Sequence, residues 1–235
     1  MTASLSLASY NIHKAVGTDR RRDPHRIAKV IAEIAPDIVA LQEVDLRFGR
    51  RTGLLNLEAL EEETGLVAVP VDRRLEAHGF HGNLILARGA EIEEVHHLAL
   101  PGLEPRGALL ADLRLDGRKL RVIGAHLGLL PQSRLSQARA ILNRIEQLDD
   151  RPMVLMGDLN EWRTGRASSL GPLAEFFHSA PIGRSFPARY PMVPLDRMMA
   201  CRRGRIDEFA VHDTALARVA SDHLPIKGRL LLATE

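Results

Sequence analysis

The chain has 235 residues, of which 45% are apolar and 26% charged, and this is the composition of a globular protein with a sizeable core. Aromatic residues make up only 4% of the chain, so the core is aliphatic. The formal net charge of +2 neither requires nor excludes a nucleic-acid partner. The single cysteine, Cys201, excludes an internal disulfide and a multi-cysteine zinc site.

The chain carries no evident targeting or membrane-spanning segment. Its N-terminal stretch lacks a charged region followed by a long apolar one, and no run approaches the roughly 18 apolar residues of a membrane span. We therefore expect a cytoplasmic protein without a transmembrane segment. No internal repeat or linker divides the sequence, so we expect residues 1–235 to form a single domain, and no obligatory protein partner is evident.

The first predicted elements are a strand and a helix. The short apolar run over residues 5–12 predicts a strand, at whose end Asn11 and His13 share one side. An Asn in a central strand is disfavoured unless its amide is satisfied, which makes Asn11 a candidate functional residue. Asp23 followed by Pro24 predicts the start of a helix, and the apolar residues after it recur at helical spacing.

The next predicted strand places a carboxylate at its end. Residues 38–41 are all apolar, which is typical of a strand covered on both faces, and Glu43 follows them closely. A carboxylate in this position is unfavourable unless it pairs with a cation or a metal ion. Ion pairing with one of the arginines that follow, such as Arg47, is the simplest interpretation.

The middle of the chain is rich in strand signals. A helix is predicted over residues 54–63 with Thr52 as its N-cap. Asp116-Gly117 is a strong hairpin signal between two apolar runs, and the second of these runs ends in His126. The strands predicted here cover residues 66–71, 84–87, 92–100, 107–115 and 120–126.

The clearest helix pattern, over residues 132–148, leads to the most informative polar pair. A buried strand begins at Met153 and ends in Gly157-Asp158-Leu159-Asn160. The side chains of Asp158 and Asn160, two residues apart, are expected on one side of the chain. A proton-accepting carboxylate beside an amide suits the positioning of an attacking water molecule, although a turn with a capping Asn has the same sequence.

The last part of the chain is less regular. Residues 179–194 are rich in Pro, Gly and Arg, which indicates either a functional loop or poor order. Strand character resumes over 195–199, and residues 205–211 are expected to pair with that strand before a final strand follows His223. Two side-chain expectations concern residues outside these elements. Trp162 is interpreted as a loop anchor rather than a stacking platform, and His96, His97 and His212 are expected to be solvated.

The many strands, with helices between only some of them, predict an α+β fold in which two sheets pack face to face with helices outside. Several polar residues lie at or beside predicted strand ends, where a rigid scaffold brings distant residues together. They are Asn11, Glu43, His126, Asp158, Asn160, Asp196 and His223. Carboxylate and amide oxygens without thiolates suit a hard divalent cation such as Mg²⁺ or Mn²⁺.

Seven segments in order carry a resemblance to a known family. They are Tyr10-Asn11-Ile12-His13, Leu41-Gln42-Glu43-Val44-Asp45, Gly82-Asn83-Leu84-Ile85-Leu86, Ala125-His126-Leu127, Gly157-Asp158-Leu159-Asn160, Leu195-Asp196-Arg197 and Ser221-Asp222-His223-Leu224-Pro225. Together they resemble the endonuclease/exonuclease/phosphatase superfamily, over nearly the whole chain. The resemblance implies a deoxyribonuclease I-like, four-layer α/β/β/α sandwich of two mixed sheets and hydrolysis of phosphoric esters with Mg²⁺ or Mn²⁺.

The resemblance also implies a role for each matching residue. Glu43 would be the principal metal ligand, with Asn11 beside it and Asp222 near the metal. Asp158 would orient and deprotonate the attacking water, and Asn160 would bind that water or the scissile phosphate.

The remaining roles concern the phosphate. His223 would contact it as proton donor or cationic clamp, held by Asp196, and His126 matches a phosphate-contacting histidine. His13 lies where many members of the family have a residue near a second metal position. Arg47 and Arg197 are further candidates for binding a substrate phosphate.

The substrate is less readable than the reaction. The segment around Asp196 lacks the aromatic residues typical of abasic-site nucleases, and it keeps only Asp196-Arg197 of the inositol phosphatase pattern. We therefore expect a phosphodiesterase acting on nucleic acid, a phospholipid or a small molecule. A phosphomonoesterase acting on a small molecule such as an inositol phosphate is the first alternative, and a catalytically silent phosphate-binding module is the second.

Overall fold

The computed structural model describes residues 4–46, 52–71 and 76–233, and within them the strands form two six-stranded sheets. The strands of the first sheet are β1 (Ser4–Asn11), β2 (Ile38–Gln42), β3 (Leu66–Ala68), β4 (Leu84–Arg88), β11 (Gly204–Val211) and β12 (Ile226–Leu232). Those of the second are β5 (Glu91–Leu100), β6 (Arg106–Leu115), β7 (Arg118–His126), β8 (Met153–Asp158), β9 (Phe177–Ser179) and β10 (Asp196–Cys201). The strand orders are β11-β12-β1-β2-β4-β3 and β5-β6-β7-β8-β10-β9, and each sheet mixes parallel and antiparallel pairs.

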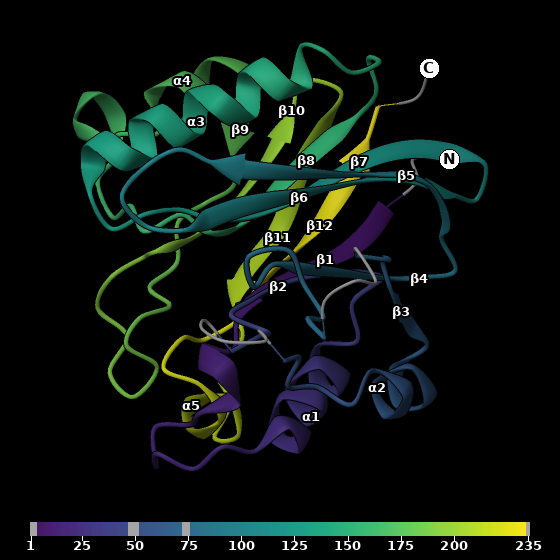
Figure 1. Ribbon diagram of the computed structural model, residues 1–235, viewed down its shortest axis with the longest axis vertical. Helices are drawn as coiled ribbons and strands as arrows, with labels where there is room; N and C mark the ends of the chain where they lie inside the picture. The colour runs from purple at the N-terminus through teal and green to yellow at the C-terminus, as the bar shows by residue number, and fades with distance from the viewer. Residues whose placement is uncertain (1–3, 47–51, 72–75, 234–235) are drawn as a thin grey trace.

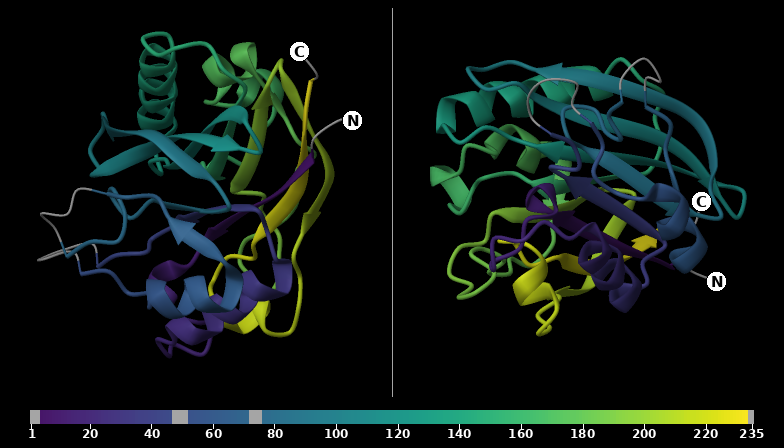
Figure 2. Two further views of the ribbon diagram at one scale, coloured as in Figure 1. Left: turned by 90° about the vertical axis from the view of Figure 1, so that its right-hand side faces the viewer. Right: turned by 60° about the horizontal axis from the view of Figure 1, so that its bottom comes forward.

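Helices cover the outer face of each sheet (Figures 1 and 2). The first sheet carries α1 (Pro24–Ile34), α2 (Leu57–Thr64) and α5 (Ala217–Ala220), and the second carries α3 (Pro131–Ile145) and α4 (Gly171–Phe176). Two short 3₁₀ helices, η1 (His13–Ala15) and η2 (Gly165–Ala167), follow β1 and β8. The predicted four-layer α/β/β/α sandwich of two mixed sheets is confirmed. Among the described residues, no helix is both long enough and apolar enough to cross a membrane.

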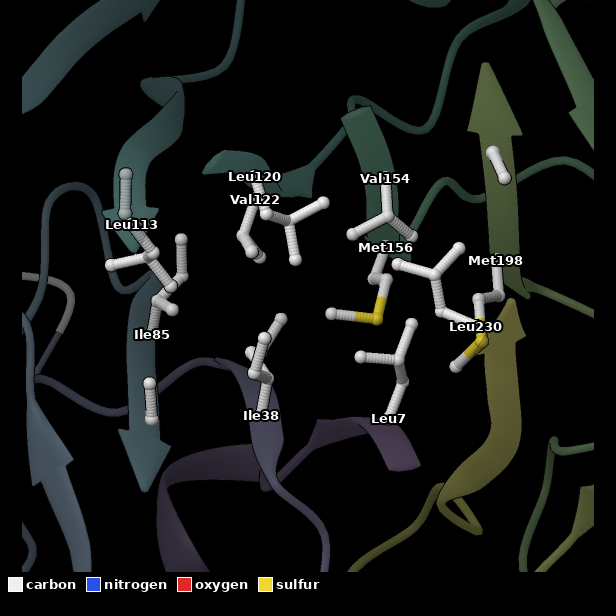
Figure 3. Packing of buried hydrophobic residues seen from close by; sticks show 14 of the residues in the cluster. Leu7, Ile38, Ile85, Leu113, Leu120, Val122, Val154, Met156, Met198 and Leu230 are labelled. Atoms are coloured by element: carbon white, nitrogen blue, oxygen red, sulfur yellow. The ribbon is translucent and has the colours of Figure 1, made fainter. Parts of the chain in front are cut away.

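The main core lies between the two sheets and is aliphatic, as the scarcity of aromatic residues predicts. Figure 3 shows Val122 and Met156 of the second sheet pointing towards Ile38 and Leu7 of the first. All four side chains are at most 1% exposed. Two further apolar clusters pack each sheet against its own helices. Both faces of each sheet are therefore buried, which explains the continuous apolar runs of the central strands.

Two parallel crossovers create the edge at which the polar residues meet. β1 and β2 are parallel and joined through α1, and β7 and β8 are parallel and joined through α3. The carboxyl ends of parallel strands lie at the same edge of their sheet. Asn11 at the end of β1 donates a hydrogen bond of 2.9 Å to Asp158 at the end of β8, so the two edges face each other across the sandwich.

The helix boundaries follow the predicted signals with two differences. Asp23 caps α1 as expected, since its carboxylate accepts hydrogen bonds from the backbone of His25 and Arg26. The helix predicted over 54–63 from Thr52 begins instead at Leu57, because Asn56 provides the cap by accepting from Ala59 N at 3.1 Å. α3 ends at residue 145 rather than 148.

The predicted pairing of residues 205–211 with the strand at 195–199 is wrong. β10 pairs with β8 on one side and with β9 on the other, so neither of its edges is available to β11. β11 pairs instead with β12 in the first sheet. The tight turn between β10 and β11 thus carries the chain from one sheet to the other, and a sequence pattern alone does not distinguish this from an ordinary hairpin.

Candidate functional site

The ends of β7 and β8 place a histidine beside a buried aspartate. His126 and Asp158 are register partners in this parallel pair, and His126 Nε2 lies 3.3 Å from Asp158 Oδ2. The strands approach closely because residue 157 is a glycine with φ of 154°, at which a Cβ atom would lie 1.8 Å from the Ala125 carbonyl oxygen. Gly157 therefore fixes the position of the carboxylate that follows it.

Asp158 is 2% exposed and is held on both oxygens. The Asn11 amide donates to Oδ2 at 2.9 Å, and the backbone N–H of Asn160 donates to Oδ1 at 3.0 Å. Burial disfavours the ionised form and raises the pKa of Asp158 to about 6, against the opposing charge of His223. The carboxylate is thus ionised at neutral pH yet unusually basic, as a general base requires.

His223 links Asp158 to a second carboxylate. Its Nδ1 atom lies 2.9 Å from Asp196 Oδ2, and its Nε2 atom lies 3.7 Å from Asp158 Oδ2. Asp196 opens β10, which is antiparallel to β8, so that Asp196 and Asp158 are register partners. Burial alone would lower the pKa of His223, but the charges of Asp196 and Asp158 outweigh it and raise the pKa to about 10. At neutral pH both ring nitrogens therefore carry protons.

Asn160 also faces this site, although it lies beyond the end of β8. Its backbone has φ of 51°, a left-handed conformation that Asn tolerates better than most residues. Its side-chain amide donates one hydrogen bond of 2.9 Å to the carbonyl of Leu127. The second N–H and the amide oxygen are not used in that contact, and the residue lines the same groove as Asp158.

A groove of about 500 Å³ connects these residues. Its polar lining is Asn11, Glu43, Arg106, His126, Asp158, Asn160, Asp222 and His223. Apolar side chains form the remaining wall, namely Leu129, Trp162, Phe186, Val193 and Leu195. A phosphate with an apolar substituent fits this mixture of charged floor and apolar wall. The structure thus brings together six predicted residues from strand ends in both sheets, as well as Asp222, and it places Asp196 directly behind His223.

Glu43 and Asp222 are the two carboxylates of the groove other than Asp158. Glu43 follows β2 with φ of 58° and pairs with the ammonium group of Lys14. Burial alone would raise the pKa of Glu43, but the contact with Lys14 outweighs it, so the pKa is lowered and the carboxylate stays ionised. The side chain of Asp222 is 35% exposed, and its Oδ1 atom lies 3.7 Å from His13 Nδ1.

The donor set of the groove fits a hard divalent cation. Glu43, Asp222 and the amide oxygen of Asn11 offer oxygen ligands, and no thiolate lies among the residues that line the groove. Within the described parts of the chain, these carboxylates are not part of a group of three acidic or histidine side chains whose ligand atoms lie within 4.8 Å of one another. An ion with few protein ligands that keeps several waters, as Mg²⁺ does, matches this arrangement.

A group of three side chains whose ligand atoms do lie within 4.8 Å of one another is found on β5 and β6, away from the groove. It consists of Glu94, His96 and Asp112. Asp112 is already held by Arg121 in two hydrogen bonds of 2.6 and 2.7 Å, and Arg144 Nη2 lies 3.2 Å from His96 Nδ1. A metal ion would have to displace these guanidinium groups, so the cluster is better explained as an ion-pair network.

The prediction that His96, His97 and His212 are solvated is wrong for two of the three. His96 and His212 are only 7% and 8% exposed, whereas His97 is exposed.

Two other predicted residues in the described part of the chain do not line the groove. Arg197 is 4% exposed and donates to the backbone carbonyls of Pro194 and Glu161, so its expected contact with a phosphate is replaced by a structural role. His13 is turned towards Asp222 and the Val16 carbonyl. Arg47 lies outside the described residues.

Two cationic residues of the site were not predicted. Arg106 Nη1 lies 2.9 Å from His126 Nε2, and Lys14 pairs with Glu43. The position of Arg106 could have been inferred from the sequence. The hairpin turn at Asp116-Gly117 sets the register that pairs Gly107 with His126, and Arg106 is the neighbour of Gly107. Lys14 follows the predicted strand end, but its left-handed backbone, with φ of 57°, is not readable from sequence.

Trp162 is not a buried anchor. Its side chain is 50% exposed and forms part of the groove wall, with the Arg163 guanidinium 5.6 Å from its ring centre. The anchoring of this loop comes instead from Glu161, which is fully buried and paired with Arg134 of α3 at 3.3 Å. The indole is therefore free to contact a bound molecule.

Comparisons with known proteins identify the family and agree with the fold. The sequence profile of the Endonuclease/Exonuclease/phosphatase family matches residues 8–223. No curated protein sequence matches significantly. Among solved structures, an endonuclease/exonuclease/phosphatase from Beutenbergia cavernae is 25% identical with a TM-score of 0.74, and the alignment covers 98% of this chain and 72% of that chain.

Two further solved structures show the fold alone. The mannosyl-6-phosphatase of Bacteroides thetaiotaomicron is 19% identical over 96% of this chain and 99% of its own, with a TM-score of 0.74. TDP2 of D. rerio in complex with a single-strand DNA product is 20% identical over 97% of this chain and 99% of its own, with a TM-score of 0.72. The same architecture therefore occurs in a mannosyl-6-phosphatase and in a protein crystallised with a single-strand DNA product.

Proposed function

The chain is a phosphoesterase of the endonuclease/exonuclease/phosphatase family, and from that premise and the geometry of the groove we propose that it hydrolyses phosphodiesters with a divalent metal ion and a water molecule activated by Asp158. The observation that carries the proposal is the buried Asp158 carboxylate. It is fixed on both oxygens, ionised at neutral pH and basic enough to take a proton from water. Asn160 and His126, which line the groove beside it, orient that water and the phosphate.

His223 supplies positive charge beside Asp158. Its protonated ring is oriented by Asp196, which leaves the Nε2 proton directed towards Asp158 and the groove. A fixed cation stabilises the charge that accumulates on the phosphoryl oxygens in the transition state. Because Nε2 faces the carboxylate that activates the attacking water, and the leaving oxygen departs on the opposite side of phosphorus, the arrangement favours the cationic clamp over the proton donor.

Glu43, Asn11 and Asp222 are the residues that would hold the metal ion. A bound Mg²⁺ or Mn²⁺ polarises a phosphoryl oxygen and neutralises developing negative charge. Lys14 competes for the same carboxylate of Glu43, so its ammonium group must move aside or share Glu43 when a metal binds.

A diester is favoured over a monoester by the apolar wall of the groove. The apolar wall offers a surface for the second substituent that only a diester carries.

Hydrolysis of bis(p-nitrophenyl) phosphate with Mg²⁺, with Mn²⁺ and with chelator tests the proposal. Asp158→Ala and His223→Ala are expected to lower kcat at least about 10²-fold, with the exposed Asp116→Asn as the matched control. Absence of metal-dependent hydrolysis, or unchanged rates in both variants, would support a silent phosphate-binding module instead. Preference for p-nitrophenyl phosphate over the diester would replace the diesterase with the phosphomonoesterase.

A further inference from the structure

Exposed apolar side chains gather at the rim of the groove. The described residues include nine exposed large hydrophobic side chains, and seven of them belong to the loops around the groove. They are Leu103 (88% exposed), Leu129 (61%), Leu130 (51%), Trp162 (50%), Ile182 (42%), Tyr190 (70%) and Met192 (70%), and we call them the apolar rim. A concentration of exposed apolar side chains around one groove is unusual for a surface that contacts only water.

The loops that carry these residues share the walls of the groove. Leu129 and Trp162 line the groove directly, and the backbone N–H of Leu129 donates to the Glu104 carboxylate, which brings the loop of Leu103 alongside. Tyr190 and Met192 lie at the tip of a loop closed by the bridge between Phe186 and Val193, two groove-lining residues. In Figure 1 this green loop, which precedes β10, projects on the left, the same side as the start of α3.

Four exposed arginines lie in the loop segments that carry members of the apolar rim. They are Arg163, Arg166, Arg184 and Arg189, and none forms an ion pair with a described residue. The two segments that carry them, residues 162–167 and 181–192, contain no acidic residue. The rim therefore presents four uncompensated positive charges together with apolar groups, and its partner must offer negative charge and apolar material at the same place.

We propose that the apolar rim and its four arginines dock onto an anionic phospholipid surface, with the groove facing the lipid headgroups. Arginines bind lipid phosphates, and Trp and Tyr side chains prefer the membrane interface. Leucine and methionine side chains gain by entering the acyl boundary. The aliphatic members of the rim disfavour single-stranded nucleic acid, because stacking on bases requires planar side chains and only Trp162 and Tyr190 are planar.

Docking would bring headgroup phosphodiesters to Asp158. That consequence rests on the proposed hydrolysis, whereas the docking itself depends only on the exposed rim. The two are separable, because Asp158→Asn removes the proposed base without changing any residue of the rim.

Co-sedimentation of the full chain with vesicles tests the proposal. Vesicles of phosphatidylcholine alone are compared with equimolar phosphatidylcholine and phosphatidylglycerol. We expect binding to the anionic vesicles to fall about 30-fold in Arg184→Gln/Arg189→Gln, given the attraction of each arginine to an anionic surface. Tyr190→Ser/Met192→Ser is expected to lower binding about 10-fold or more through the loss of apolar burial.

Matched controls lie on other faces of the chain. Arg118→Gln/Arg202→Gln removes two exposed arginines, and Val67→Ser removes an exposed apolar side chain of β3, and both variants are expected to bind as the unmodified chain does. Both rim variants should retain hydrolysis of soluble bis(p-nitrophenyl) phosphate, which also shows that they fold. Asp158→Asn should bind vesicles fully while losing hydrolysis.

Three results would overturn the docking. They are no binding of the unmodified chain to anionic vesicles, equal loss in the rim variants and their controls, or rim-dependent binding of a single-stranded oligonucleotide without binding to vesicles. Vesicle binding by a chain that hydrolyses no phosphoester would instead leave the docking in place and remove the proposed function.

Discussion

His223 and Asp196 form a buried pair that joins the two sheets of the sandwich. His223 Nδ1 lies 2.9 Å from Asp196 Oδ2, and the two residues are 5% and 1% exposed. Asp196 opens β10 of the second sheet, whereas His223 precedes β12 of the first. The charge and orientation of His223 therefore depend on how the two sheets pack against each other.

The proposed hydrolysis should have a bell-shaped pH dependence. Burial raises the pKa of Asp158 to about 6, so the basic carboxylate, and with it the activity, is lost as the pH falls through that value. His223 has a pKa of about 10, where its carboxylate neighbours outweigh burial, so its positive charge is lost as the pH rises through that value. Measurement of kcat/KM for the soluble diester across this range checks both limbs.

Asp196→Asn should move the alkaline limb to lower pH. Loss of the negative charge beside Nδ1 lowers the pKa of His223, and because the same charge also raises the pKa of Asp158, the acid limb should move to lower pH as well. kcat is expected to fall about 10²-fold because the ring is no longer held in its orientation. An alkaline limb that stays in place would show that Asp196 does not control the charge of His223.

Asp158→Asn should abolish hydrolysis, and its Tm relative to that of the unmodified chain should be higher at pH 8 than at pH 4. The amide cannot accept from both Asn11 and the backbone of Asn160, so one hydrogen bond is lost at either pH. Because the pKa of the buried Asp158 carboxyl is raised to about 6, its ionisation costs stability only at the higher pH, and the amide removes that cost. A Tm difference that is the same at pH 4 and pH 8 would contradict this account.

Glu43→Gln should weaken the binding of Mn²⁺ at least about 10-fold in a calorimetric titration, with little effect on folding. Lys14→Met should act in the opposite direction on affinity, because the competing ammonium group is removed from Glu43. Lys29→Met, an exposed lysine on α1, is the matched control. Unchanged affinity in Glu43→Gln would show that Glu43 is not a ligand.

Gly157→Ala should destabilise the fold by about 3 kcal/mol or more, because a Cβ atom would overlap the Ala125 carbonyl oxygen at 1.8 Å. Gly171→Ala is the matched control, since nothing lies within 4 Å of its Cβ position. Urea denaturation of both variants measures the difference. Equal unfolding midpoints would mean that β7 and β8 can separate without loss of stability.

The order of chemistry-bearing residues was readable from the sequence because strand ends are local signals. Asn11, Glu43, His126 and Asp158 each follow a buried apolar run, and such runs identify strands covered on both faces. The four-layer sandwich followed from the family resemblance together with this pattern. Apolar periodicity, turn residues and helix caps act over a few residues, so a linear sequence is sufficient to find them.

Only the tertiary structure decided which groups meet. The contact of Arg106 with His126 depends on hairpin register, and the pairing of Lys14 with Glu43 depends on a left-handed turn. Arg197 was expected at the substrate, yet burial directs its guanidinium to backbone carbonyls. The charge of His223 and the basicity of Asp158 arise from desolvation and from partners on the other sheet, and neither property exists until both sheets have packed.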